Sequence, residues 1–73
     1  MVKVEFLGPI EKDSIKLDIK NLKELSIYMK NDVTLKDWID ISAVAVNGTL
    51  IDSLDFQFKD GDIVSILPPV CGG

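Results

Sequence analysis

Residues 2–30 read VKVEFLGPIEKDSIKLDIKNLKELSIYMK, and the spacing of the apolar residues changes within this stretch. Apolar and polar residues alternate over residues 2–6 and again over residues 15–19, which is typical of two strands that each bury one face. The apolar residues that follow are three and four positions apart, as on the buried stripe of a helix: Leu22, Leu25 and Met29. The stretch therefore predicts a β-hairpin followed by a helix.

Polar residues bracket the predicted helix. Asn21 suits the N-cap, and Glu24 is placed to accept a hydrogen bond from the Asn21 backbone N–H, as in a capping box. Residues 31–32, Asn-Asp, are expected to end the helix. Thr34 and Asp37 are then expected to cap a short second turn whose apolar residues point inward: Leu35, Trp38 and Ile39.

Further strands are predicted in the second half of the chain. Residues 43–46 are small, apolar and β-branched, and the Asn47-Gly48 pair after them tolerates the positive φ angles of a tight turn. Residues 50–51 would form a brief returning strand. Residues 63–67 form the predicted last strand, which Pro68-Pro69 stops because proline offers no backbone donor.

This element order predicts one α+β domain over residues 1–67, with a mixed sheet of four to five strands packed on the main helix. The β-grasp arrangement fits the order, although periodicity alone leaves other small α+β topologies open. Residues 68–73 are expected to form an extended C-terminal tail, because two consecutive prolines favour a stiff, extended backbone.

Composition narrows the possible functions. The chain has 73 residues, 47% of them hydrophobic and 27% charged, as in a small ordered domain. Its formal net charge of −4 opposes nucleic-acid binding and favours a basic protein surface as partner. No apolar run approaches the roughly 20 residues that cross a bilayer, so we expect a cytoplasmic protein that binds no membrane. With no histidine and one cysteine, we expect no metal site and no histidine general base.

The chain ends in the residues PPVCGG, positions 68–73. Glycine has no Cβ, so the Gly72-Gly73 end is slim enough to enter a channel that any side chain would block. Its α-carboxylate becomes an acyl donor only after an enzyme uses ATP to form an acyl adenylate, and sulfur transfer onto that adenylate gives a nucleophilic thiocarboxylate. The alternative is that the two glycines only fray, as chain ends commonly do.

Residues 2–7 (VKVEFL), 44–48 (VAVNG) and 59–73 (KDGDIVSILPPVCGG) together resemble the MoaD/ThiS family of ubiquitin-like sulfur carriers. The Pro-Pro-Val-x-Gly-Gly form is most similar to the small subunits of molybdopterin synthase. The resemblance implies a β-grasp fold. It also implies that an E1-like adenylyltransferase, consuming ATP, adenylates the Gly73 carboxylate, and that a sulfurtransferase or sulfide donor converts it to a thiocarboxylate.

The resemblance further implies a place in molybdenum cofactor biosynthesis. The tail would enter the active site of a large subunit and donate sulfur to cyclic pyranopterin monophosphate, within a heterotetramer of two carriers and two large subunits. The chain would then be a non-catalytic, sulfur-donating subunit without a bound cofactor, and the catalytic residues would belong to its partner. Two alternatives stay open: a carrier for thiazole formation in thiamin synthesis, and a β-grasp interaction module whose tail is idle.

Partner-binding positions are carried over from the family as Leu7, Leu50, Leu67 and the tail residues Pro68, Pro69, Val70 and Cys71. Strand parity indicates that Leu7 and Leu67 face away from the core. Three outward leucines would form an apolar patch of the kind that marks an interface, whereas scattered surface leucines are the alternative.

The sequence departs from the family pattern in two places. Residues 10–12 are Ile-Glu-Lys where the family often has Val-Arg-Glu, so any ionic contact of that arginine is absent or reversed. Cys71 stands where a smaller residue is common. It is either a tolerated small side chain, or a thiol that captures the activated Gly73 or forms a mixed disulfide with a sulfur donor.

Overall fold

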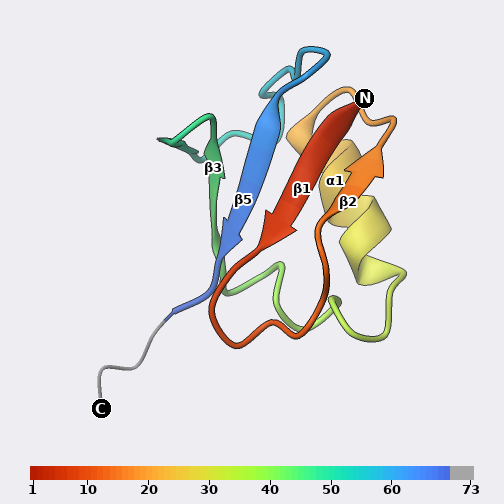
Figure 1. Cartoon of the computed structure of the whole chain (residues 1–73), viewed down its shortest axis with the longest axis vertical. Coiled ribbons are helices and arrows are strands. Elements are labelled where there is room, and N and C mark those ends of the chain that lie inside the picture. The colour runs from red at the N-terminus through yellow and green to blue at the C-terminus, as the bar shows by residue number, and fades with distance from the viewer. Residues whose placement is uncertain (70–73) are drawn as a thin grey trace.

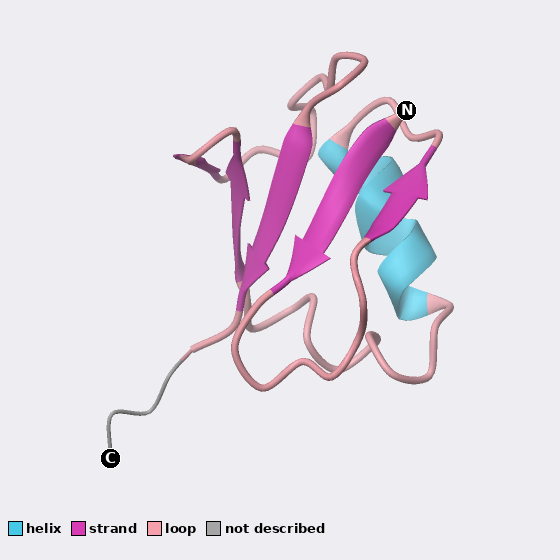
Figure 2. Ribbon diagram, in the orientation of Figure 1, coloured by secondary structure: helices cyan, strands magenta, loops and turns pink. Residues whose placement is uncertain are grey.

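A five-stranded mixed sheet and one helix make up the described part of the chain, residues 1–69, in the computed structural model; residues 70–73 lie outside the described residues. The elements are β1 (Val2–Phe6), β2 (Ile15–Leu17), α1 (Leu22–Lys30), β3 (Ala43–Val46), β4 (Thr49–Ile51) and β5 (Ile63–Leu67). Helix α1 covers one face of the sheet and leaves the other face open (Figures 1 and 2). Within the described residues, no helix is long and apolar enough to cross a membrane.

The strands lie in the order β2-β1-β5-β3-β4. The two central strands, β1 and β5, run parallel although they come from opposite ends of the chain, and Val4 lies beside Val64. The outer pairs are antiparallel, and Asn47 and Gly48 turn the β3–β4 hairpin with φ angles of 51° and 86°. This is the β-grasp, or ubiquitin-like, arrangement, so the predicted fold class is confirmed.

The core lies between α1 and the covered face of the sheet. Its fully buried side chains include Leu25 and Met29 from the helix, Val4 and Ile66 from the central strands, and Leu35 from the segment after the helix. The alternation of buried residues in β1 and β5 follows the period of two seen in the sequence. The predicted buried stripe of the helix is therefore confirmed.

The cap of α1 differs from the predicted capping box in one bond. The Asn21 side chain accepts from the Glu24 backbone N–H at 2.9 Å, as an N-cap residue should. The Glu24 carboxylate, however, accepts from the Lys20 N–H at 2.8 Å and not from that of Asn21. The chain on either side of Asn21 is held by an isolated antiparallel bridge with Gln57, in which the Leu22 N–H donates to the Phe56 carbonyl at 3.2 Å and the Phe58 N–H donates to the Lys20 carbonyl at 2.8 Å.

The segment after the helix is capped by Asp32, whereas the sequence predicted Thr34 and Asp37. The Asp32 carboxylate accepts from the Thr34 backbone N–H at 2.8 Å, and the Asp32 carbonyl accepts from the Leu35 N–H at 3.0 Å. These bonds begin a series of turns that buries Leu35 and half-buries Trp38. The inward direction of the apolar residues is confirmed, and the capping residues are corrected.

Lys12, at one of the positions where the chain departs from the family's Val-Arg-Glu pattern, forms an ion pair with Asp32. Its ammonium group donates to the Asp32 carboxylate at 3.0 Å, and both side chains are mostly shielded, with 27% and 21% of their surface exposed. The hydrogen bond from Lys12 and the backbone N–H of Thr34 lower the pKa of Asp32 below its ordinary value of 3.8. The ion pair of Lys12 with Asp32 connects the loop after β1 to the end of the helix.

We expect Asp32→Asn to destabilise the protein at neutral pH, because the variant keeps the acceptor for Thr34 but loses the charge that Lys12 meets. A carboxylate whose folded-state pKa is lowered stabilises the fold above its unfolded-state pKa, and this contribution is lost as pH falls through the folded-state pKa. The urea midpoint of the variant should therefore lie furthest below that of wild type at about pH 7, and this difference should become smaller below about pH 4. Asp13→Asn, at an exposed carboxylate nearby, is the control, and a difference that persists unchanged in acid would contradict this account.

Candidate docking face and tail root

The open face of the sheet carries the candidate partner-binding leucines. Leu67 on β5 lies beside Ala43 on β3, and Ala45 on β3 lies beside Leu50 on β4. Leu7 directly follows the buried Phe6 and donates its N–H to the Ile66 carbonyl at 3.1 Å. Since directly paired residues project from the same face, Leu7, Leu50 and Leu67 all lie opposite the helix.

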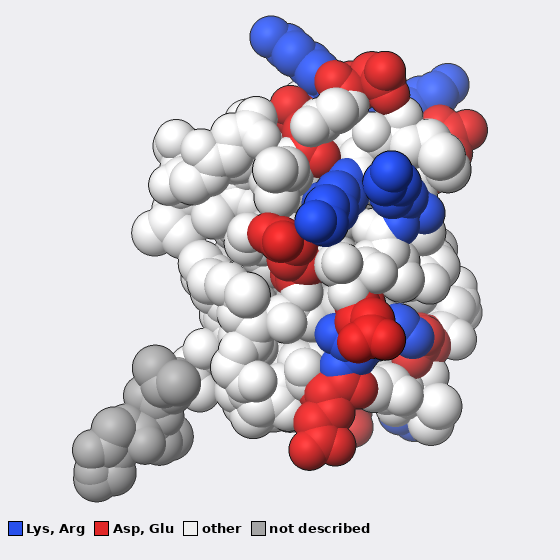
Figure 3. All heavy atoms as spheres, viewed as in Figure 1, with Lys and Arg blue, Asp and Glu red and all other residues white. Residues whose placement is uncertain are grey.

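These leucines differ in exposure. Leu50 is 66% exposed and Leu7 is 41% exposed, while Leu67 is half-buried. Ala45 is buried but lies outside the core cluster, because it faces the open side and is covered by its neighbours there. Figure 3 shows uncharged surface on this side over β3, with charged side chains over β1 and β2. We define the apolar patch as Leu7, Ala43, Ala45, Leu50 and Leu67.

The chain leaves the sheet at the end of β5, beside the loop that follows β1 (Figure 1). Pro68 is buried and Pro69 is exposed, so the first tail residue packs against the domain. Gly8 has a φ of +64°, and a Cβ at this position would lie 3.3 Å from the Pro68 Cγ atom. Gly8 therefore provides the space in which Pro68 packs at the root of the tail.

Gly8 and Pro9 come shortly after β1, and in the sequence a glycine-proline pair at this place indicates only that the strand ends there. The role of Gly8 beside Pro68 depends on the parallel pairing of β1 and β5, which brings positions 8 and 68 together. A glycine in the sequence signals that the backbone there can adopt a positive φ angle. It does not indicate that Pro68 is the residue packed against it.

We expect Gly8→Ala to destabilise the protein by about 1–2 kcal/mol, the cost of the left-handed backbone conformation for a residue with a Cβ. The tight contact with Pro68 should add to this cost. Gly48→Ala is the matched control, because Gly48 also has a positive φ of 86° but no atom within 4 Å of the added Cβ. Urea unfolding would measure both variants, and equal destabilisation would argue against packing of Pro68 at Gly8.

The predicted reactive end, Gly72-Gly73, and the predicted contacts Val70 and Cys71 lie outside the described residues. Among residues 1–69, no group of three or more histidine, cysteine, aspartate or glutamate side chains is placed to hold a metal ion. Every side chain that is fully buried in this part of the chain is apolar. The described domain thus presents the apolar patch on the open face of the sheet, beside the point where the tail begins.

The strand order, the single helix on one face and the apolar patch beside the start of the tail are those of a small ubiquitin-like protein. The chain belongs to the ThiS family, whose profile matches residues 4–73. The MoaD/ThiS sulfur-carrier family inferred from the sequence is thereby confirmed. No curated protein matches the chain.

Three solved structures are similar over nearly their whole length. A chain in the complex of subunits 1 and 2 of molybdopterin-converting factor from Helicobacter pylori is 44% identical, with a TM-score of 0.89 and coverage of 99% of this chain and 97% of that one. SAMP1 from Haloferax volcanii is 17% identical, with a TM-score of 0.78 and coverage of 99% and 98%. The thiamine biosynthesis protein ThiS from Geobacter metallireducens is 23% identical, with a TM-score of 0.60 and coverage of 97% and 99%. The last two show the shared fold alone.

Proposed function

We propose that the chain is the sulfur-carrier small subunit of molybdopterin synthase. One observation carries this proposal: the 44% identity, over 99% of the chain, to a protein solved in the complex of the two molybdopterin-converting factor subunits. The Pro-Pro-Val-Cys-Gly-Gly ending supports it from the sequence.

The tail supplies the reactive group. An E1-like enzyme transfers AMP from ATP to the Gly73 carboxylate and releases pyrophosphate. A sulfide donor then attacks the activated carbonyl and displaces AMP, which leaves a thiocarboxylate. The charged sulfur is a strong nucleophile, and the absence of side chains on Gly72 and Gly73 lets it enter a narrow active site. The large subunit supplies the catalytic residues, and cyclic pyranopterin monophosphate receives the sulfur.

The domain supplies the recognition surface. The apolar patch lies on the open face at the end of the sheet where the tail leaves, as its members Leu7 and Leu67 are next to the ends of β1 and β5. A partner that covers this patch would hold the tail near its own active site, which raises the effective concentration of the thiocarboxylate there. Docking and delivery therefore involve one continuous region.

The proposal is tested by mixing the purified chain with a molybdopterin synthase large subunit and, separately, with a thiazole synthase. We expect a stable complex only with the large subunit, measured by co-elution in size-exclusion chromatography. Intact mass after incubation with ATP, the E1-like enzyme and a sulfide source should rise by the difference between sulfur and oxygen. Co-elution with the thiazole synthase alone would assign the chain to thiamin synthesis instead.

We expect Leu50→Ser to weaken binding of the large subunit by about fivefold or more, because truncation of an interface anchor costs over about 1 kcal/mol. Leu54→Ser is the matched control. Leu54 is similarly exposed, at 55% against 66% for Leu50, but it lies beside α1, where its carbonyl accepts from the Lys23 N–H at 3.1 Å. Isothermal titration would compare the two, and equal affinities would remove the patch from the interface.

A further inference from the structure

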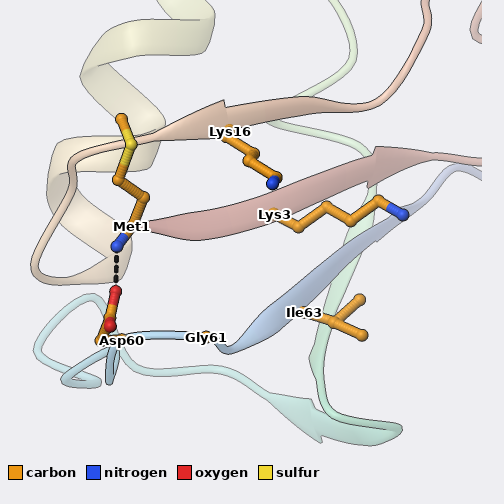
Figure 4. Close-up of a pocket in the computed structure, with 6 residues that line it drawn as sticks. All are labelled: Met1, Lys3, Lys16, Asp60, Gly61 and Ile63. Atoms are coloured by element: carbon orange, nitrogen blue, oxygen red, sulfur yellow. Dashed lines mark hydrogen bonds and ion pairs between the residues drawn. The ribbon is translucent and has the colours of Figure 1, made fainter.

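Two lysines lie directly opposite each other on the open face of the sheet. Lys3 on β1 pairs in register with Lys16 on β2, and both are exposed. Figure 4 shows their side chains extending across the sheet from these adjacent strands. Like charges placed directly opposite on neighbouring strands repel each other, so this arrangement opposes folding.

Little within the described residues relieves this repulsion. The Lys3 ammonium lies 3.7 Å from a Glu5 carboxylate oxygen, but both side chains are well exposed and such pairs contribute little. Lys16 forms no ion pair with any residue of the range 1–69. The Asp60 carboxylate, at the edge of the same area, is already paired with the N-terminal ammonium group of Met1 (Figure 4).

An exposed apolar side chain completes the arrangement. Ile63 on β5 is the register partner of Lys3 on its other side and is 42% exposed. The two lysines and Ile63 line an open depression of about 480 Å³ together with Met1, Asp60 and Gly61. The row Lys16, Lys3, Ile63 thus combines two positive charges with an apolar contact, on the same face as the apolar patch.

We propose that Lys3 and Lys16 bind carboxylate side chains of a partner protein, on a segment that also places an apolar residue against Ile63. A carboxylate between the two ammonium groups would accept charge-assisted hydrogen bonds from both and turn their repulsion into attraction. The net charge of −4 favours basic partners, but the row Lys16, Lys3, Ile63 carries two positive charges, with the single negative charge of Glu5 beside it. The inference deepens the proposed function by assigning acidic character to the docking surface of the partner, and it rests on that function only for the identity of the partner.

The test uses a peptide, Glu-Leu-Glu-Leu-Glu, titrated into the ¹⁵N-labelled full chain at low ionic strength. We expect shifts of the backbone amides of Lys3, Lys16 and Ile63, and a loss of affinity on the order of three- to tenfold for Lys16→Glu. Lys23→Glu is the matched control, because it changes the net charge equally at an exposed position on α1, which covers the opposite face. In parallel titrations, Lys-Leu-Lys-Leu-Lys should leave these amides unchanged, and inorganic phosphate, which has no apolar group for Ile63, should shift them less than the acidic peptide does.

Lys16→Glu separates binding from folding. It replaces the repulsion of Lys3 by an attraction, so its urea midpoint should equal or exceed that of wild type while its affinity for the acidic peptide falls. Equal weakening by Lys16→Glu and Lys23→Glu would overturn the proposal, because net charge alone would then explain the effect. A stronger response to the basic peptide or to phosphate would also overturn it.

A second measurement separates this inference from the proposed function. Association rates of wild type, Lys16→Glu and Lys23→Glu with the large subunit would be compared at low and high salt. We expect Lys16→Glu to associate several-fold more slowly at low salt and the difference to disappear at high salt. Failure of wild type to bind the large subunit would refute the proposed function while the peptide titration still decides the inference.

Discussion

Deletion of Gly73 is expected to abolish sulfur delivery while the domain stays folded. The deletion shortens the chain by one residue, so the activating enzyme would meet the carboxylate of Gly72 at the wrong depth in its active site. Positioning errors of about 1 Å can reduce rates by about a hundredfold, and a residue spans up to about 3.6 Å. Intact mass after activation would show no gain of sulfur, and the thermal unfolding midpoint should not change.

Gly73→Ala provides the control for this experiment. This variant keeps the carboxylate at the original chain length and adds only a Cβ. We therefore expect its rate of activation to be lower than that of wild type but higher than that of the deletion variant. Full sulfur delivery by the deletion variant would refute the carrier function. The domain would then be an interaction module with an idle tail.

Leu25→Ala is expected to have the largest effect on stability. Leu25 is a large side chain with 0% exposure between α1 and the sheet. Truncation of a buried leucine to alanine costs about 2–5 kcal/mol, through lost burial and the cavity left behind. A domain of this size has a total stability of only about 4–11 kcal/mol, so a large share is lost.

Urea unfolding would measure this loss through the midpoint at constant slope. Leu54→Ala is the control, because Leu54 is 55% exposed and its truncation should change the stability by about 0.5 kcal/mol or less. A similar effect of the two variants would contradict the position of Leu25 at the centre of the core.

The expected effects of Leu25→Ala and of the Gly73 deletion arise in different parts of the molecule. Leu25 is buried in the core beneath the sheet, whereas the parallel pairing of β1 with β5 brings Leu7, Gly8 and Pro68 to one end of the sheet. Gly73 carries the reactive carboxylate in the proposed function. Leu25→Ala should therefore reduce sulfur delivery only to the extent that it unfolds the domain, whereas deletion of Gly73 acts without unfolding.

The local elements and the family could be predicted from the amino-acid sequence. Alternation over residues 2–6 and the three-and-four spacing of Leu22 and Leu25 predict strand and helix because each backbone has its own period. Asn21 marked the start of the helix because its short polar side chain can accept a hydrogen bond from a backbone N–H of the first turn. The PPVCGG ending is likewise a local signal, and it supported the family that the comparisons confirmed.

Contacts between residues far apart in the sequence could not be predicted, because they depend on which strands pair in the sheet. The antiparallel pairing of β3 with β5 places Leu67 beside Ala43, and the parallel pairing of β1 with β5 brings Pro68 against Gly8. No local period encodes which strands become neighbours. The positions of charged side chains relative to one another also depend on the tertiary structure. Net charge is a sum over the chain, whereas the opposition of Lys3 and Lys16 depends on strand register, which is set by burial of the hydrophobic face.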